Sequence, residues 1–153
     1  MLKGREIRGL AVYAGRNREE VGRVSDMVVD GMTGQVIGLV IQNNGMLAKN
    51  LFVELQNVRE LAKTGVIVPN KSHIKKLPKR AQTLYQQGWL GSPLYSHDGM
   101  DRGTVADILV QDGNVAGLEI SSGFVSDLHN RREFLPWQNV QNRDGGFYED
   151  SFH

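Results

Sequence analysis

The chain has 153 residues, of which 40% are hydrophobic and 23% are charged, and its formal net charge is +1. This composition is that of an ordinary globular protein, and the length suits one domain of average size or two small ones. The absence of Cys excludes disulfides, thiolate metal sites and a cysteine nucleophile. The sequence shows neither a secretory signal peptide nor a run of about 18 apolar residues, so we expect a cytoplasmic protein without direct membrane insertion.

Short motifs recur in the same order at an offset of about 80 residues, which indicates an internal duplication. Each half carries Gly-x-Val-x-Asp, a turn, the pattern Val-x-Gly-Leu-x-Ile or a close variant, and then Gln-Asn-Val. The motifs of the first half lie at 22–26, 36–41 and 56–58. Those of the second half lie at 103–107, 115–120 and 138–140.

Apolar residues alternate with a period of two in both halves, and many are β-branched, which predicts strands. Turn residues at 30–34 and 111–114 separate strand pairs, and Asp-Gly tolerates the positive φ angles of tight hairpins. We therefore expect one hairpin from 21–30 and 35–41 and another from 102–110 and 115–120. Further strands are expected at 10–13, 51–55, 65–68, 93–95, 134–137 and 146–149, which gives about five strands per half.

The junction at 69–88 interrupts the strand pattern and is basic. No acidic residue occurs between Glu60 and Asp98, and the composition of 79–87 favours a short helix that ends at Gly88. A sheet of about five short strands removes its open edges by closing into a barrel. The predicted fold class is therefore all-β, with two tandem small antiparallel β-barrels at 1–70 and 89–150 and a short linker at 71–88.

Domains of this size are marginally stable alone, so we expect the halves to pack on each other or on a second chain in a homodimer. The motifs at Gly22 to Ile41 and at Gly103 to Ile120 resemble those of the PRC-barrel family. The second half also has Leu135-Pro136, which resembles the Leu-Pro that this family places before its last strand pair, whereas the first half has Val53-Glu54. The resemblance implies a tandem barrel similar to the reaction-centre H subunit's cytoplasmic domain and the C-terminal domain of RimM-type ribosome maturation factors. It implies an adaptor and no particular chemistry.

Several recurring residues are predicted to have structural roles in both copies. These repeat positions are Gly22, Asp26, Gly38, Gly103, Asp107 and Gly117. An Asp beside a strand commonly accepts backbone N–H groups, and we favour that role over catalysis for Asp26 and Asp107. The four histidines lack the spacing of a metal site or a catalytic triad, and no glycine-rich phosphate motif occurs. We therefore predict no catalytic, cofactor-binding or metal-binding residues.

Two segments are candidates for partner binding. The basic linker contributes Lys71, Lys75, Lys76, Lys79 and Arg80, which together could contact RNA phosphates or serve only to solubilise the linker. The loop residues Phe124, Val125 and Leu128 are too apolar for a plain solvent loop, and they either cover one end of the barrel or contact a protein. The sequence predicts a non-catalytic protein-interaction adaptor, with RNA or ribosome-assembly binding through the linker as the alternative and an enzyme as the least favoured class.

Overall fold

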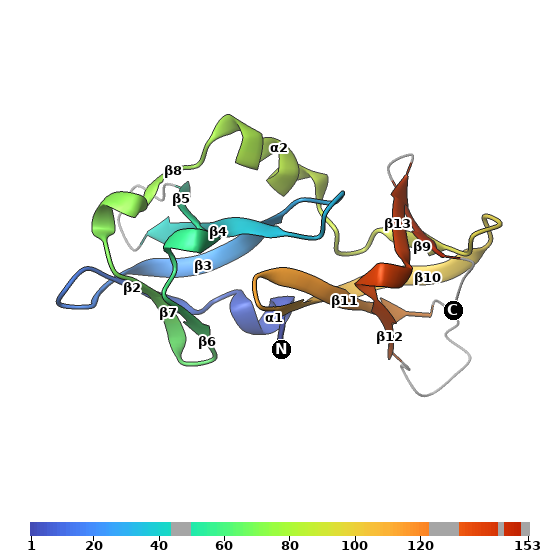
Figure 1. Ribbon diagram of the computed structural model, residues 1–153, viewed down its shortest axis with the longest axis horizontal. Helices are drawn as coiled ribbons and strands as arrows, with labels where there is room; N and C mark the ends of the chain where they lie inside the picture. Colours follow the sequence, from blue (N-terminus) through green and yellow to red (C-terminus); the bar gives the residue numbers. More distant parts are fainter. Residues whose placement is uncertain (44–49, 123–131, 144–145, 151–153) are drawn as a thin grey trace.

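A computed structural model describes residues 1–43, 50–122, 132–143 and 146–150, and it contains two seven-stranded sheets lying side by side along the long axis (Figure 1). The first sheet has the order β6-β7-β2-β3-β4-β5-β8. Its strands are β2 (Ala11–Ala14), β3 (Glu19–Val29), β4 (Val36–Asn43), β5 (Asn50–Glu54), β6 (Glu60–Ala62), β7 (Gly65–Val68) and β8 (Lys75–Lys76).

The second sheet has the order β12-β11-β10-β9-β14-β13, with the N-terminal strand β1 (Leu2–Lys3) added to β10. Its other strands are β9 (Pro93–Tyr95), β10 (Asp101–Gln111), β11 (Asn114–Ser121), β12 (Arg132–Pro136), β13 (Val140–Arg143) and β14 (Gly146–Glu149). The helices are α1 (Gly4–Ile7), α2 (Lys79–Gln87) and the 3-10 turns η1 (Leu55–Asn57), η2 (Lys71–His73) and η3 (Trp137–Asn139).

The two sheets repeat one topology, so the fold class and the tandem arrangement predicted from the sequence are confirmed. In each half a long hairpin, β3–β4 or β10–β11, is extended on one side by β5 or β12. On the other side, β2 pairs in parallel with β7, and β9 pairs in parallel with β14. Among the described residues neither sheet closes by hydrogen bonding, so the halves are open, barrel-like sheets instead of the closed barrels that we expected.

The tight hairpin between β10 and β11 follows from its turn residues. Asp112 has φ 52° and Gly113 has φ 78°, and two successive residues with positive φ match the right-handed twist of the flanking strands. This turn contacts the first half directly, because the N–H of Val36 donates to the Gly113 carbonyl at 2.9 Å and the N–H of Val115 donates to the Gly34 carbonyl at 2.7 Å. The starts of β4 and β11 are thus joined by backbone hydrogen bonds.

The N-terminal segment also connects the halves, which the sequence pattern did not reveal. Leu2 pairs with Val110 and Lys3 pairs with Leu109, so β1 belongs to the second sheet although the following β2 belongs to the first. Between them, the short helix α1 lies where the two sheets meet (Figure 1).

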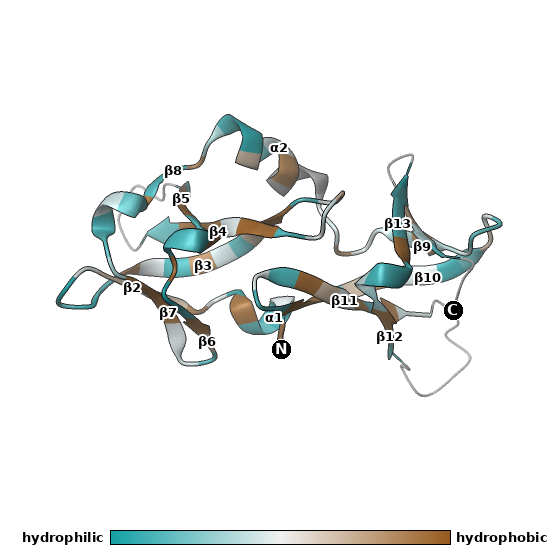
Figure 2. Ribbon diagram, viewed as in Figure 1, coloured by the Kyte–Doolittle hydropathy of each residue, from teal (hydrophilic) through white to brown (hydrophobic). Residues whose placement is uncertain are grey.

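The main hydrophobic core is continuous across the two halves. It joins the fully buried Ile7, Leu39 and Ile41 to Leu94 and Leu118 of the second half. Hydrophobic residues gather in the strands and on part of α2, while most turns are hydrophilic (Figure 2). We expect burial of this shared apolar surface to be the main force that holds the halves together.

A smaller core lies on the other face of the first sheet. There, α2 packs Ala81 and Leu84 against Val28, Val40 and Phe52. Just before the helix, β8 adds to the edge of β5, with Phe52 opposite Lys75 and Leu51 opposite Lys76. Residues 75–87 thus contact the first half over one sheet edge and one sheet face.

Candidate binding groove between the two halves

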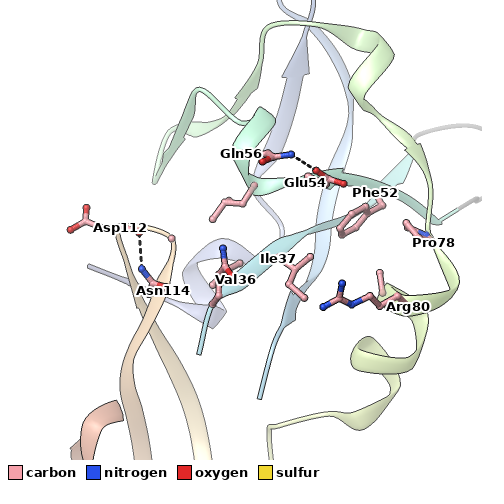
Figure 3. A pocket seen from close by; sticks show the side chains of 13 residues that line it. Val36, Ile37, Phe52, Glu54, Gln56, Pro78, Arg80, Asp112 and Asn114 are labelled. Carbon is pink, nitrogen blue, oxygen red and sulfur yellow. Dashed lines mark hydrogen bonds between the residues drawn. The ribbon is translucent and has the colours of Figure 1, made fainter. Parts of the chain in front are cut away.

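A groove of about 560 Å³ opens where the first sheet, α2 and the β10–β11 turn meet (Figure 3). Its volume is in the range of sites that hold a small molecule or a few side chains of a protein partner. The lining residues are Gln35, Val36, Ile37, Phe52, Glu54, Leu55, Gln56, Pro78, Arg80, Ala81, Asp112, Gly113 and Asn114. Both halves therefore contribute to it.

The floor of the groove is apolar. Ile37 on β4 and Phe52 on β5 project from neighbouring strands, and Leu55 follows at the start of η1 (Figure 3). Phe52 lies over Gly38, where any β-carbon would come within 2.4 Å of its ring. The glycine therefore lets the ring lie flat on the sheet, next to the groove.

The rim of the groove carries opposite charges on facing walls. On one wall Glu54 accepts a hydrogen bond from Nε2 of Gln56 at 2.5 Å. On the other, Arg80 extends from α2 toward Ile37 (Figure 3), and this exposed guanidinium makes no ion pair with any residue that the structure describes. At the end formed by the second half, Nδ2 of Asn114 donates to the Asp112 carbonyl at 3.2 Å. The rim thus offers a cation, the two carboxylates of Glu54 and Asp112, and amide groups around an apolar floor.

The basic residues predicted from the linker are spread over several environments. Lys71 forms an ion pair with Glu19 and lowers the pKa of that carboxyl group. Lys75 and Lys76 are exposed on β8, and Lys79 begins α2. Of the five, only Arg80 lines the groove. The apolar candidates Phe124, Val125 and Leu128 lie outside the described residues.

The recurring glycines lie at close backbone or ring contacts. A β-carbon at Gly22 would come within 2.3 Å of the Gln42 carbonyl oxygen, and one at Gly103 would come as close to that of Ser121. Gly38 lies under Phe52, and Gly117 lies under Phe134 in the same way.

The recurring aspartates both accept the N–H of the following residue. Asp26 accepts from Met27 at 2.7 Å, and Asp107 accepts from Ile108 at 2.8 Å. Each also faces an arginine of the N-terminal segment, Arg8 at 3.7 Å from Asp26 and Arg5 at 3.6 Å from Asp107.

The sequence pattern did not predict the charged cluster around Glu119. Glu119 is buried. Its carboxylate oxygens lie 3.2 Å from Nζ of Lys3, 3.2 Å from Nη1 of Arg5 and 2.7 Å from Nη1 of Arg132. Burial opposes ionisation, but the hydrogen bonds from Arg132, Lys3 and Arg5 outweigh it and lower the pKa of Glu119 to about 2. One signal was present in the sequence, because the repeat places this carboxylate where the first half has Val40.

Within the described residues, no group of three or more His, Asp or Glu side chains is arranged to hold a metal ion. In the same part of the chain, no helix has the length and apolar character needed to cross a bilayer.

The model of the PRC-barrel domain family matches residues 1–74 and 83–152. The chain belongs to the PRC-barrel family. Since the family model matches twice, this tandem PRC-barrel protein carries one domain of the family in each half. No curated protein matches the chain.

Among solved structures, a similar one is that of a putative 16S ribosomal RNA processing protein RimM from Pseudomonas aeruginosa. It is 16% identical, with 85% of this chain and 94% of that chain covered, and the TM-score is 0.33. A likeness at this level carries no argument about function.

Proposed function

We propose that this tandem PRC-barrel protein is a non-catalytic adaptor that holds a short segment of a partner protein in the groove between its halves. The observation that supports this most is the combination of an apolar floor, formed by Ile37, Phe52 and Leu55, with an Arg80 on the rim that forms no ion pair with any described residue. Sites that hold partner segments commonly combine apolar anchoring with a few polar groups that fix orientation.

The lining residues support binding over catalysis. None of the thirteen described lining residues is a Ser, Thr, Lys or His, so the lining offers no hydroxyl or amine nucleophile and no imidazole base. Its two carboxylates, Glu54 and Asp112, are both exposed, and Glu54 is hydrogen-bonded to Gln56. A bound segment would place an apolar side chain on the floor and an acidic group at Arg80.

Site-specific photocrosslinking tests this proposal. A photoreactive amino acid is placed at Gln56 or Asn114, both exposed on the rim, and as a control at Asn17, which is exposed in the β2–β3 turn. Crosslinking in extract of the source cells should give the same protein adduct from Gln56 and Asn114, unaffected by nuclease, and none from Asn17. Adducts of equal yield at all three positions, or at none, would contradict the proposal.

A matched pair of charge reversals gives a second test. Arg80→Glu should remove the adduct, because it reverses the charge of the one cation among the described lining residues. Lys75→Glu makes the same change in charge on β8, outside the lining residues, and should leave the adduct in place. The loop residues Phe124, Val125 and Leu128 are proposed as additional contacts of the same partner, so Phe124→Ser and Leu128→Ser should weaken its binding.

A second candidate function is binding of RNA, including ribosomal RNA, along β8 and the start of α2. It is favoured by the proximity in sequence of Lys75, Lys76 and Lys79, which are exposed and form no ion pair with described residues. Affinity for a single-stranded RNA oligonucleotide should then fall with salt, with a logarithmic slope of about 0.7 per phosphate contact. A flat response, or no loss of affinity in the double variant Lys75→Glu/Lys76→Glu, would argue against RNA binding.

A further inference from the structure

Each half carries a phenylalanine at the same position of the repeat, but the two rings differ in how far the chain buries them. Phe52 on β5 lies opposite Val40, and Phe134 on β12 lies opposite Glu119, at the matching position of the repeat. Each ring also lies over a glycine, Gly38 or Gly117, so closely that a β-carbon there would be only 2.4 Å from the ring. Phe52 and Phe134 are therefore equivalent residues of the two copies.

In the first half the aromatic ring is covered by the chain itself. β8 extends the sheet beyond β5, with Lys75 opposite Phe52. Leu77 and α2 then cover the ring, so that Phe52 is only 4% exposed. In the first half, therefore, the sheet edge beside the ring is filled by an added strand, β8, and by the apolar side chains that follow it.

In the second half the same position is uncovered among the described residues. β12 is the last strand of its sheet, and no described strand pairs with its outer edge. Phe134 is 50% exposed, which is unusual for a large aromatic residue in the middle of a strand. Pro136 at the end of β12 fits an edge position, since proline cannot donate to a further strand.

The charges around Phe134 differ from those of the first half and indicate which segment would bind. The apolar Val40 is replaced by Glu119, around which Lys3, Arg5 and Arg132 gather. The three cations face two buried carboxylates, Glu119 and Asp107, so the cluster has an excess of one positive charge. Arg5 and Arg132 are about half exposed and can form further ion pairs.

We propose that the outer edge of β12 binds an extended segment of a partner protein in which an apolar and an acidic residue lie two positions apart, so that both point to the face of the sheet that carries Phe134 and Arg132. The segment adds to β12 as β8 adds to β5, an apolar side chain packs on Phe134, and an acidic side chain pairs with Arg132 or Arg5. Main-chain hydrogen bonds supply affinity in such strand addition, and the alternate side chains supply specificity. This site is separate from the groove, because none of its residues lines that cavity.

The test uses the full chain and a fluorescent peptide of about six residues in which Val and Asp take turns at every second position, with Thr between them, so that Val and Asp share one face. The peptide should bind saturably, and NMR should show slowed amide exchange in residues 132–135. The same peptide with Lys in place of Asp should bind at least about tenfold more weakly, since each unfavourable charge pair costs affinity. Phe134→Thr should weaken the acidic peptide by about tenfold, as expected when an aromatic anchor is removed.

Two control variants separate this site from other surfaces. Met32→Thr replaces an apolar residue that is even more exposed but lies in the β3–β4 turn, and Arg80→Gln changes the groove. Both should bind the acidic peptide like the wild type.

Lack of saturable binding, equal binding of the two peptides, or exchange protection outside β12 would overturn the proposal. A Phe134-dependent dimer in sedimentation experiments would also overturn it, by showing that a second copy of the chain occupies the edge.

Discussion

Trp137 of the second half lies against the α-carbon of Gly34 in the first half, so closely that a β-carbon there would be 2.4 Å from the indole Nε1. Gly34 also has φ +75°, and its carbonyl accepts a hydrogen bond from the N–H of Val115. The turn between β3 and β4 therefore serves two purposes, since it reverses the chain and forms part of the contact between the domains. Trp137 in turn stacks on Trp89 with ring centroids 5.4 Å apart.

Gly34→Ala should destabilise the protein by about 3 kcal/mol, because it combines strain from positive φ with overlap of the Trp137 ring. The measurement is urea unfolding followed by circular dichroism. Gly99→Ala is the matched control, with φ +89° but nothing within 4 Å of the new β-carbon, and should cost about 1 kcal/mol. Equal losses in the two variants would show that the Trp137 contact contributes nothing.

Glu119→Gln should destabilise the protein by about 2 to 3 kcal/mol at pH 7, because it leaves Lys3, Arg5 and Arg132 without their shared carboxylate. The folded protein lowers the pKa of Glu119 to about 2 from 4.5, so this stabilisation is fully present above pH 4.5 and is lost as the pH falls through about 2. The difference between wild type and variant in free energy of unfolding should therefore shrink from pH 5 to about pH 2. Glu60→Gln, at an exposed carboxylate, is the matched control for the loss of one negative charge.

Ile7→Ala should lower the stability of both halves together, because Ile7 is fully buried in the core that they share. The expected loss is about 3 kcal/mol. Unfolding followed by circular dichroism, which reports both sheets, should coincide with unfolding followed by fluorescence of Trp89 and Trp137, which are both in the second half. Separate transitions in the wild type would contradict a single cooperative unit.

Phe52→Ala should destabilise the protein more than Phe134→Ala, although the two residues are equivalent in the repeat. Phe52 is 4% exposed under α2, whereas Phe134 is 50% exposed. We expect losses of about 4 and about 1 kcal/mol, respectively, in urea unfolding. Similar losses would contradict the difference in burial between the two rings.

The sequence was sufficient to predict the duplication and the strands, because both depend on local patterns. The hairpin at Asp112-Gly113 and the alternation along β10 and β11 are typical of strands, whatever lies around them. The open sheets could not be predicted in this way, since closure depends on contacts between strands distant in sequence. The packing of α2 could not be predicted in this way either, because it depends on apolar residues such as Val28 and Val40 on the face of the first sheet that points away from the main core.

The candidate site was predicted only in part. Arg80 was selected as one of several linker cations, but the groove that it lines also needs Leu55 and Asn114, which come from the two halves. Nothing local marks those two residues, and the contact between β4 and β11 brings them together. The cluster around Glu119 likewise combines Lys3 and Arg132, which are distant in sequence.

The pairing of Leu2 with Val110 has a consequence for synthesis on the ribosome. Leu2 and Lys3 leave the exit tunnel before β10 has been made, so they cannot reach their native position while most of the first domain emerges. Such long-range pairing slows folding, and domains otherwise tend to fold in order of synthesis. β1 is thus made well before its partner strand and is among the last parts of the fold to become ordered.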